Sequence, residues 1–511
     1  METVKLRRAT CISLSVVLLS VVCLAASSVP SSGALPAMWS SPAMISSGEA
    51  MDIAVDEDSM YVVGFDQLIT SHDSGSTWDS VPSTYAKICA DQGVLYRASF
   101  DLEVYYGATI MFAMSTDDGA TWSDSIPILT LEGRNDWSFG LFKFGTRLML
   151  YTLDGEPGGN EFGAMVKVAW SDDEGSTWSE PVIVDEGLYV EDPFPNDIVC
   201  ANGVLYLTYY DQTSGFDSVE IIVAQSADMG ATWSNAVVAV GPTAHNPIIS
   251  ADAFSGELYV SYFSAIVMPD WTLVNAGPYF VKSIDGVTWS VPVKAGTITM
   301  ATDHSGFHSL VASDGMIFEG YLDYVRTDAG DVYDLRISCS SDDGATWMDM
   351  GDVTGMETNS IYPILAIASE RLHFIWTDYG SGNPWYDPGI IYHRSMPLGV
   401  TVFGEATVLR QKTGNPAGDA KTLSYAPDKD GLLWISGVSD KLPVLKVDVY
   451  VKGTGKASLV STQYVIFGSK NPGPLESSMV KVAAGQEYLV KLTPYGMVGA
   501  SAEVTGLFVA G

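Results

Sequence analysis

Ser71-His-Asp73-Ser-Gly75-Ser-Thr77-Trp78 is the first copy of a pattern, Ser-x-Asp-x-Gly-x-Thr-Trp, that recurs along the chain. Four further full copies occupy 115–122, 171–178, 226–233 and 340–347. A copy that is one residue shorter occupies 283–289. The first residues of successive copies are 44, 56, 55, 57 and 57 positions apart. This period is typical of one small antiparallel sheet with its connections, so the sequence predicts an all-β repeat protein.

Each position of the motif has a physical role in a tight hairpin turn. The Asp carboxylate accepts hydrogen bonds from amides ahead of it, and the Gly adopts a positive φ without a Cβ clash. We expect the Thr hydroxyl to bond back to the backbone, and the Trp ring to lie between neighbouring sheets with its indole N–H on a carbonyl. The predicted structural carboxylates are Asp73, Asp117, Asp173, Asp228, Asp285 and Asp342.

These copies resemble the Asp-box, or bacterial neuraminidase repeat, and residues 37–400 resemble the Asp-box β-propellers of the sialidase superfamily. The resemblance implies that each box lies between the third and fourth strands of a blade, on the face opposite the ligand site. It also implies that ligands bind over the loops joining strands two to three and four to one. The boxes therefore indicate the fold and leave the activity open.

Strand patterns around the copies predict seven units of the propeller. The seventh unit, 362–395, has no box and no fourth strand of its own. The segment Trp39-Ser-Ser-Pro-Ala-Met-Ile45 has the pattern of a fourth strand, so we expect it to pair beside Ile390 to Ser395 and close the ring. Because many sialidase propellers have six blades, six blades is the alternative. After the boxes end, residues 401–511 predict a separate C-terminal β-sandwich.

The first residues are typical of a secretory signal. Basic residues precede an apolar run at 11–24, and small residues follow, so we predict a signal peptide over 1–27 and a secreted or cell-surface protein. An uncleaved membrane anchor is the alternative, and it is the only membrane contact expected. The chain has 61 acidic and 26 basic residues and a net charge of −35, which argues against a nucleic-acid partner.

A sialidase would hold the carboxylate of its substrate with arginines, because planar guanidinium groups bind carboxylates in pairs of hydrogen bonds. The resemblance implies an Arg-Ile-Pro motif before the first box, two further arginines, an Asp acid/base and a Tyr nucleophile assisted by Glu. No arginine occurs between residues 37 and 70. The resemblance therefore covers the fold, and the usual sialidase activity is not predicted.

The expected ligand face carries acidic residues beside aromatic ones, as sugar binding requires. We expect no cofactor and no metal site, since His304 and His308 have no evident third ligand. The favoured interpretation is a module that binds a glycan or a surface protein. The alternatives are a divergent glycoside hydrolase with paired carboxylates and a structural surface or fibre component. The candidate ligand residues are Arg134, Asp136, Trp137, Asp192, His245, Asp303, His304, Arg326 and Trp385.

Overall fold

A computed structural model gives the structure of the chain from residue 39 to residue 510, apart from internal gaps. The predicted signal at 1–27 lies outside the described residues. The gaps are 102–106, 133–137, 156–162, 191–196, 253–255, 269–272, 299–306, 314–315, 328–329, 341–342, 346, 355–357, 370, 383–386, 399, 403–406, 411–419, 428–430, 441–443, 454–456, 468–473, 477, 484 and 496–500.

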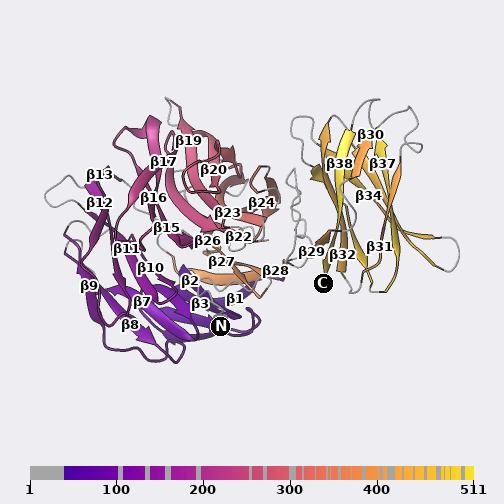
Figure 1. Cartoon of the computed structure of the whole chain (residues 1–511). Helices are drawn as coiled ribbons and strands as arrows, with labels where there is room; N and C mark the ends of the chain where they lie inside the picture. The colour runs from indigo at the N-terminus through magenta and orange to yellow at the C-terminus, as the bar shows by residue number, and fades with distance from the viewer. Residues whose placement is uncertain are drawn as a thin grey trace, which may run out of the picture.

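The described part of the chain is nearly all β-structure (Figure 1). Its antiparallel strands form seven four-stranded sheets, numbered 1 to 7 in chain order, and two five-stranded sheets after them. A short 3₁₀ turn, η1 (Phe216–Ser218), is the helical element in these residues. Within the described ranges, no helix is long and apolar enough to cross a membrane.

The strands of sheets 1 to 3 are β2 (Ala50–Asp56), β3 (Ser59–Gly64), β4 (Gln67–Ser71), β5 (Asp79–Pro82); β6 (Lys87–Asp91), β7 (Val94–Phe100), β8 (Thr109–Ser115), β9 (Ile126–Thr130); β10 (Phe139–Phe144), β11 (Arg147–Gly155), β12 (Gly163–Ser171) and β13 (Val182–Tyr189). Those of sheets 4 to 6 are β14 (Ile198–Ala201), β15 (Val204–Asp211), β16 (Val219–Ser226), β17 (Ser234–Gly241); β18 (His245–Ala251), β19 (Leu258–Val267), β20 (Leu273–Ser283), β21 (Val293–Lys294); β22 (His308–Ser313), β23 (Met316–Thr327), β24 (Gly330–Ser340) and β25 (Met348–Asp352). Sheet 7 contains β26 (Ser360–Ala368), β27 (Arg371–Asp378), β28 (Ile390–Pro397) and β1 (Ala43–Ser47).

The N-terminal strand β1 completes sheet 7, as the sequence predicts. It pairs antiparallel with β28, with Ala43 opposite His393 and Ser47 opposite Ile390. The preceding residues extend this contact, because the Ser40 N–H donates to the Ser395 carbonyl at 2.8 Å. The two ends of the seven-sheet segment are therefore hydrogen-bonded to one another.

Consecutive sheets pack on one another through their first strands. Strand β2 contacts β6, β6 contacts β10, β14 contacts β18, β18 contacts β22, and β22 contacts β26. Sheets 3 and 4 share one buried apolar cluster that includes Met149 and Tyr206. Strand β26 also contacts β2, so sheet 7 packs on sheet 1.

The six motif copies, called the repeat turns below, connect the third and fourth strands of sheets 1 to 6. In the first, Asp73 accepts hydrogen bonds from the Thr77 backbone N–H at 2.8 Å and the Thr77 hydroxyl at 2.6 Å. The Gly75 N–H donates to the Ser71 hydroxyl at 2.9 Å. The expected Thr bond to the backbone is therefore wrong, because the charged carboxylate is in reach and is the stronger acceptor. The same Thr–carboxylate bonds occur at Asp117, Asp173 and Asp228.

The glycines of the repeat turns have positive φ, from 71° to 102°, as predicted. In the five full copies the residue before the glycine is also left-handed, with φ between 55° and 59°. The short copy at 283–289 lacks that residue, and Asp285 accepts instead from the N–H groups of Val287 and Thr288 at 2.9 and 2.7 Å. Asp342 lies outside the described residues.

Each repeat glycine also lies against the preceding sheet. A Cβ on Gly175 would lie 2.1 Å from the Phe112 ring, and one on Gly344 would lie 2.0 Å from the Phe280 ring. A Cβ on Gly75 of sheet 1 would lie 2.5 Å from His393 of sheet 7. The glycines are therefore required for close packing between sheets as well as for the turn.

The motif tryptophans pack against the same preceding sheets. The ring centroid of Trp178 lies 5.4 Å from that of Phe112, and Trp347 lies 5.1 Å from Phe280. The indole N–H of Trp78 donates to the Gly75 carbonyl of its own turn at 3.1 Å. These contacts are the inter-sheet position and carbonyl bond that the motif predicts.

The two last sheets share an apolar core. One contains Leu433 and Val480, the other Leu445, Val447 and Val490, and all five side chains belong to one buried cluster. Figure 1 shows these sheets face to face, to one side of the seven-sheet segment. Their strands are β29 (Val400–Val402), β30 (Thr407–Arg410), β32 (Gly431–Asp440), β36 (Ser478–Val482), β38 (Ser501–Ala510); and β31 (Lys421–Tyr425), β33 (Val444–Val451), β34 (Ser458–Phe467), β35 (Pro474–Glu476) and β37 (Tyr488–Tyr495).

Candidate functional site

Most of the predicted ligand residues fall in gaps of the structure. His245 is the exception whose side chain is described. The predicted residues outside the described positions are Arg134, Asp136, Trp137, Asp192, Asp303, His304 and Trp385, together with the side chain of Arg326.

His245 begins β18 and is held by its neighbours. Its Nδ1 lies 2.6 Å from the Thr243 carbonyl oxygen, and its ring centroid lies 5.0 Å from that of Phe263. Burial lowers the pKa of His245 to about 4, so the ring is neutral at pH 7.

His308, considered with His304 for metal binding, is buried between sheets 5 and 6. Its Nδ1 lies 2.7 Å from Glu319 Oε1, and its Nε2 lies 2.6 Å from the Asn246 carbonyl oxygen. Both ring nitrogens therefore have protein partners. In the described part of the chain, no group of three or more His, Cys, Asp or Glu side chains is arranged to hold a metal ion.

A group of ionisable side chains converges where the first strands of several sheets meet. Asp52 lies on β2, Lys87 begins β6, and Asp197 immediately precedes β14. Lys87 Nζ lies 3.6 Å from Asp52 Oδ1, and Asp52 Oδ2 accepts the Ile88 N–H at 3.1 Å. The side chains of Asp52 and Lys87 are 24% and 15% exposed, so the pair is sunken but in contact with solvent.

Two tyrosines complete this central cluster, which consists of Asp52, Tyr85, Lys87, Tyr151 and Asp197. The Tyr151 ring lies over the innermost strand of sheet 3, where a Cβ on Gly140 would be 2.4 Å from it. Burial raises the pKa of Tyr151 well above its usual value, and the charges of Asp197 and Asp52 add to the shift. Residues from four sheets thus influence one another's protonation.

The protonation states within the central cluster differ. Burial, with the charge of Asp52 adding to it, raises the pKa of Asp197 to about 7 against the opposing hydrogen bond from the Ile198 N–H. Burial opposes the charge of Lys87, yet the pKa of Lys87 is raised because Asp52 and Tyr85 favour the ammonium. Near neutral pH the cluster therefore combines a lysine cation with a carboxyl group, Asp197, that gains or loses its proton readily.

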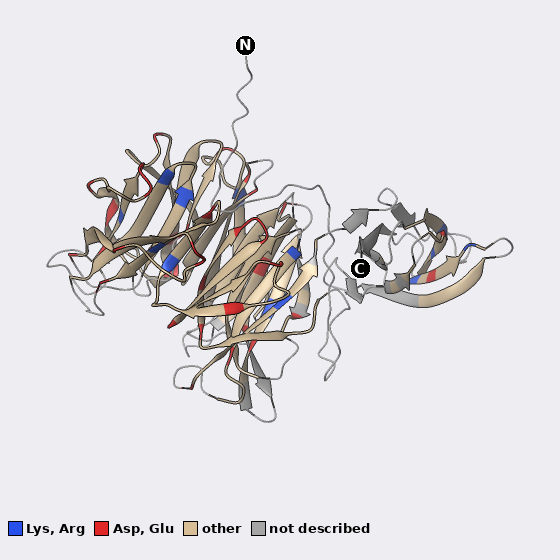
Figure 2. Cartoon of the chain, turned by 90° about the horizontal axis from the view of Figure 1, so that it is seen from below, with Lys and Arg blue, Asp and Glu red and all other residues tan. Residues whose placement is uncertain are grey.

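The central cluster lies toward the face opposite the repeat turns. The Ser74 N–H of the first repeat turn donates to the Asp58 carbonyl at 3.4 Å, so the turn between β2 and β3 lies on the repeat-turn face. The first strands therefore begin at the other face, where Lys87 and Asp197 are located. Figure 2 shows that Asp and Glu greatly outnumber Lys and Arg over the described sheets.

A second group lies where sheet 7 meets sheet 1, on the same face. Tyr362 has a φ of 58°, which bulky side chains rarely adopt, and its ring packs edge-on against Phe307 at 4.9 Å. Burial, with the charge of Glu49 adding to it, raises the pKa of Tyr362 to about 12 and that of Tyr379 further. These shifts hold the proton on both hydroxyls more firmly than on an ordinary tyrosine.

The described arginines of the seven sheets have structural partners. Arg97 stacks over Trp122 at 4.2 Å, and Arg394 donates to the carbonyls of Ser40 and Val353. Arg371 donates to the Ser395 hydroxyl, and Arg336 lies 3.7 Å from Asp323.

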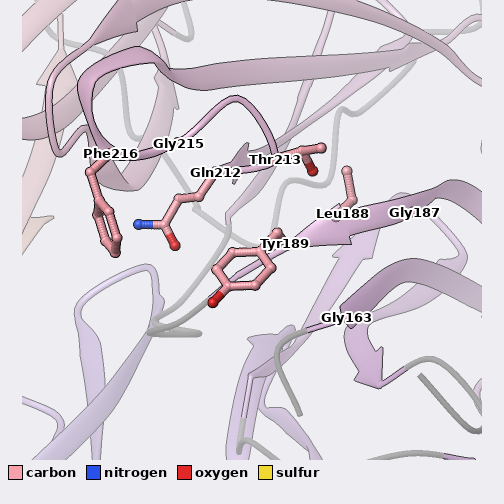
Figure 3. A pocket seen from close by; sticks show the side chains of 8 residues that line it. All are labelled: Gly163, Gly187, Leu188, Tyr189, Gln212, Thr213, Gly215 and Phe216. Atoms are coloured by element: carbon pink, nitrogen blue, oxygen red, sulfur yellow. The ribbon is translucent and has the colours of Figure 1, made fainter. Parts of the chain in front are cut away.

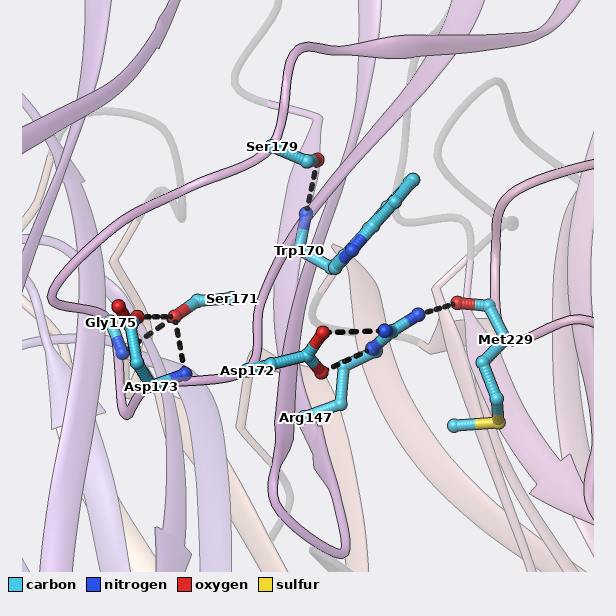
Figure 4. Close-up of polar contacts among 8 residues, drawn as sticks. All are labelled: Arg147, Trp170, Ser171, Asp172, Asp173, Gly175, Ser179 and Met229. Atoms are coloured by element: carbon cyan, nitrogen blue, oxygen red, sulfur yellow. Dashed lines mark hydrogen bonds and ion pairs between the residues drawn. The ribbon is translucent and has the colours of Figure 1, made fainter.

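Arg147 belongs to the repeat-turn face (Figure 4). It makes two hydrogen bonds to the Asp172 carboxylate, at 2.7 and 2.6 Å, and one to the Met229 carbonyl at 2.5 Å. Its guanidinium also lies 5.1 Å from the Trp170 ring centroid. Arg147 therefore joins the repeat turn of sheet 3 to that of sheet 4.

The central cluster is not among the ligand residues predicted from the sequence, because that prediction considers only the loops that the resemblance implies for ligand binding. Asp52 and Lys87 lie within strands, and Asp197 immediately precedes one. A charged residue in or next to the first strand of a sheet is the feature of the sequence that could have identified this cluster, because these strands otherwise bury apolar side chains. That feature points to an inward-facing charge that needs a partner or a function.

No protein-family profile matches the chain, and no curated protein matches it. Among solved structures, it is similar to the Trypanosoma rangeli sialidase in complex with sialic acid, with 13% identity and a TM-score of 0.40 over 84% of this chain and 92% of the sialidase. It is also similar to the α-L-arabinofuranosidase from Fusarium graminearum, with 15% identity and a TM-score of 0.40 over 61% and 92%. The Penicillium chrysogenum α-L-arabinanase gives 14% identity and a TM-score of 0.41 over 70% and 98%.

Proposed function

We propose that the chain is an Asp-box β-propeller of seven blades that binds a glycan on the face opposite its boxes. The observation that carries the proposal is the convergence of Asp52, Lys87 and Asp197, with two tyrosines, from four separate sheets. Carboxylates and an ammonium bond sugar hydroxyls, and the half-buried Tyr85 offers ring surface to a pyranose, whereas Tyr151 is buried and takes no part in stacking. A glycan would bridge these groups across the centre of the ring.

Several contacts support the closed ring within this proposal. Strand β1 pairs with β28, β26 contacts β2, and the first repeat turn lies against His393 of sheet 7. A closed ring leaves no first or last sheet with an open face, which removes a route to aggregation. In the proposal, residues 37–400 form this propeller and residues 401–511 a β-sandwich.

The proposal includes secretion or display on a cell surface, after removal of residues 1–27. The basic start, apolar run and small residues of this segment support it, and a net charge of −35 suits a soluble extracellular protein better than one that binds nucleic acid. A surface glycan is the partner that fits both this location and the central cluster.

The test is binding of the full chain to an array of neutral and acidic glycans, followed by titration of the best ligand. Replacing both carboxyls, in Asp52→Asn with Asp197→Asn, should weaken binding at least tenfold, since each charged hydrogen bond contributes about 1.5 to 3 kcal/mol. Asp66→Asn, an exposed carboxylate on a loop of the same face, is the matched control and should bind normally. Unchanged binding by the double variant would refute the central site.

A divergent glycoside hydrolase is the second candidate. Two observations favour it. The pKa of Asp197 is raised to about 7. Asp52, whose charge contributes to that shift, forms an ion pair with Lys87. A protonated carboxyl paired with an ionised one is the acid/base combination that glycosidases use. Hydrolysis of nitrophenyl glycosides should then decline as pH rises through about 7, the pKa of Asp197, and vanish in Asp197→Asn. Absence of turnover with every glycoside that the protein binds would leave the binding function alone.

A further inference from the structure

A second concave site lies away from the central cluster, between sheets 3 and 4 (Figure 3). Its volume is about 430 Å³, within the usual range for small-molecule sites. Tyr189 ends the fourth strand of sheet 3, and Gln212 follows the second strand of sheet 4. Both strand ends point away from the repeat turns, so this rim pocket opens on the same face as the central cluster.

The rim pocket has the chemistry of a sugar site. It is lined by Leu188, Tyr189, Gln212, Thr213 and Phe216, with three glycines, and none of these side chains is acidic or basic. Phe216 is 52% exposed, so its ring is accessible to a ligand. Figure 3 shows the Gln212 amide between the rings of Phe216 and Tyr189.

The walls of the rim pocket are held in place by hydrogen bonds. Asp211 Oδ1 accepts from the Tyr189 N–H at 2.9 Å and from the Thr213 N–H and hydroxyl at 2.9 and 2.6 Å. The Gln212 N–H donates to the Tyr189 carbonyl at 2.9 Å, and the Phe216 carbonyl accepts the Thr243 N–H at 2.6 Å. The backbone from which the rings and the amide project is therefore fixed, which lowers the entropic cost of ordering the pocket on binding.

We propose that the rim pocket binds one residue of a neutral saccharide, stacked on Phe216 and hydrogen-bonded through its hydroxyls to the Gln212 amide. An amide both donates and accepts, so it matches paired sugar hydroxyls without requiring a charged ligand. A charged sugar is disfavoured because the described lining residues carry no counter-charge. The inference rests on the proposed function only for the class of ligand, since the two sites share no residues.

The experiment is a calorimetric titration that measures the affinity of the full chain for cellotetraose, arabinotetraose, mannotetraose and lacto-N-tetraose. Phe216→Ala should weaken binding of the preferred tetrasaccharide by about tenfold, as loss of a central aromatic contact does. Gln212→Ala should weaken it as well. Tyr495→Ala, which removes a 42%-exposed aromatic ring from the C-terminal sheets, is the matched control and should leave affinity unchanged. A melting curve for each variant verifies that it is folded.

The outcomes separate the rim pocket from the central cluster. Loss of binding in Phe216→Ala, with binding retained in the double variant Asp52→Asn with Asp197→Asn, supports the rim pocket and counts against the central site. Loss in the double variant alone overturns the rim pocket and leaves the proposed function standing. The rim pocket is also refuted if the wild-type protein binds none of the four neutral tetrasaccharides.

Discussion

His393 Nε2 lies 3.0 Å from His373 Nδ1, and the two rings stack with centroids 5.2 Å apart inside sheet 7. The Trp78 ring, from the repeat turn of sheet 1, lies 5.1 Å from His393 on its other side. The histidine pair is therefore packed at the contact between sheet 1 and sheet 7. Protonation of either ring would place a positive charge in this buried contact, near the charge of Arg371.

This pair predicts an acid-sensitive contact. Burial lowers the pKa of His373 to about 4 and that of His393 to about 3, and nearby Arg371 adds to both shifts. Because the folded pKa values are depressed, their contribution to stability is complete above the unfolded pKa of about 6.5 and is lost as pH falls toward 3. His373→Gln should flatten the decline of melting temperature between pH 7 and pH 4. His72→Gln, at an exposed position, should keep the wild-type slope.

Substitutions in the repeat turns should lower stability and leave glycan binding intact. Asp228→Ala removes the acceptor for the Thr232 N–H and hydroxyl, at 2.8 and 2.6 Å. Melting temperature and affinity, measured on the same sample, distinguish the two effects. A variant that kept its melting temperature and lost binding would show that the turns are functional.

The repeat glycines should differ in how much stability is lost when alanine replaces them. Gly230→Ala should cost about 1 to 2 kcal/mol for the left-handed conformation, because its Cβ would meet only the mobile end of Met149 at 2.7 Å. Gly175→Ala should cost more, since its Cβ would lie 2.1 Å from the Phe112 ring, which is part of a buried cluster. Denaturant unfolding measures both values, and equal costs would contradict the packing argument.

Arg147 should stabilise the contact between sheets 3 and 4. Arg147→Lys should lower the free energy of unfolding by about 1 to 2 kcal/mol, because a lysine cannot bond Asp172 twice and also reach the Met229 carbonyl. Asp172→Asn should cost less, as the bond to Met229 and the Trp170 contact remain. The reverse order in urea unfolding would indicate that the ion pair, and not the bridge between turns, is the main contribution.

The protein should not cleave a standard α-sialoside. The first arginine of the expected carboxylate clamp is missing, and Arg97, Arg147 and Arg394 are engaged elsewhere. Each lost charge-assisted bond costs about 1.5 to 3 kcal/mol of binding. The net charge of −35 would also repel the anionic substrate. The assay is release of a fluorescent aglycone by protein lacking residues 1–27, from acidic to neutral pH and in high salt. Release abolished by replacing Arg134 or Arg326 would reveal a clamp built from those positions.

Local chemistry is what the amino-acid sequence determined. The order Ser-x-Asp-x-Gly-x-Thr-Trp was sufficient to predict the turns, because Asp73, Gly75 and Thr77 interact with atoms at most four residues away. The pairing of β1 with Ile390–Ser395 was also predictable, since a strand without a partner at one end matched a sheet lacking a strand at the other. The Thr hydroxyl was assigned the wrong partner because two acceptors lay within its reach.

Only the tertiary structure decided where the ionisable groups meet. Asp52, Lys87 and Asp197 are far apart in the sequence, and nothing in the sequence shows that these charged residues meet. Their protonation depends on burial and on Coulomb interactions between different sheets, which arise only after the first strands pack together. The same holds for the rim pocket, because Tyr189 and Phe216 become neighbours through the contact between sheets 3 and 4.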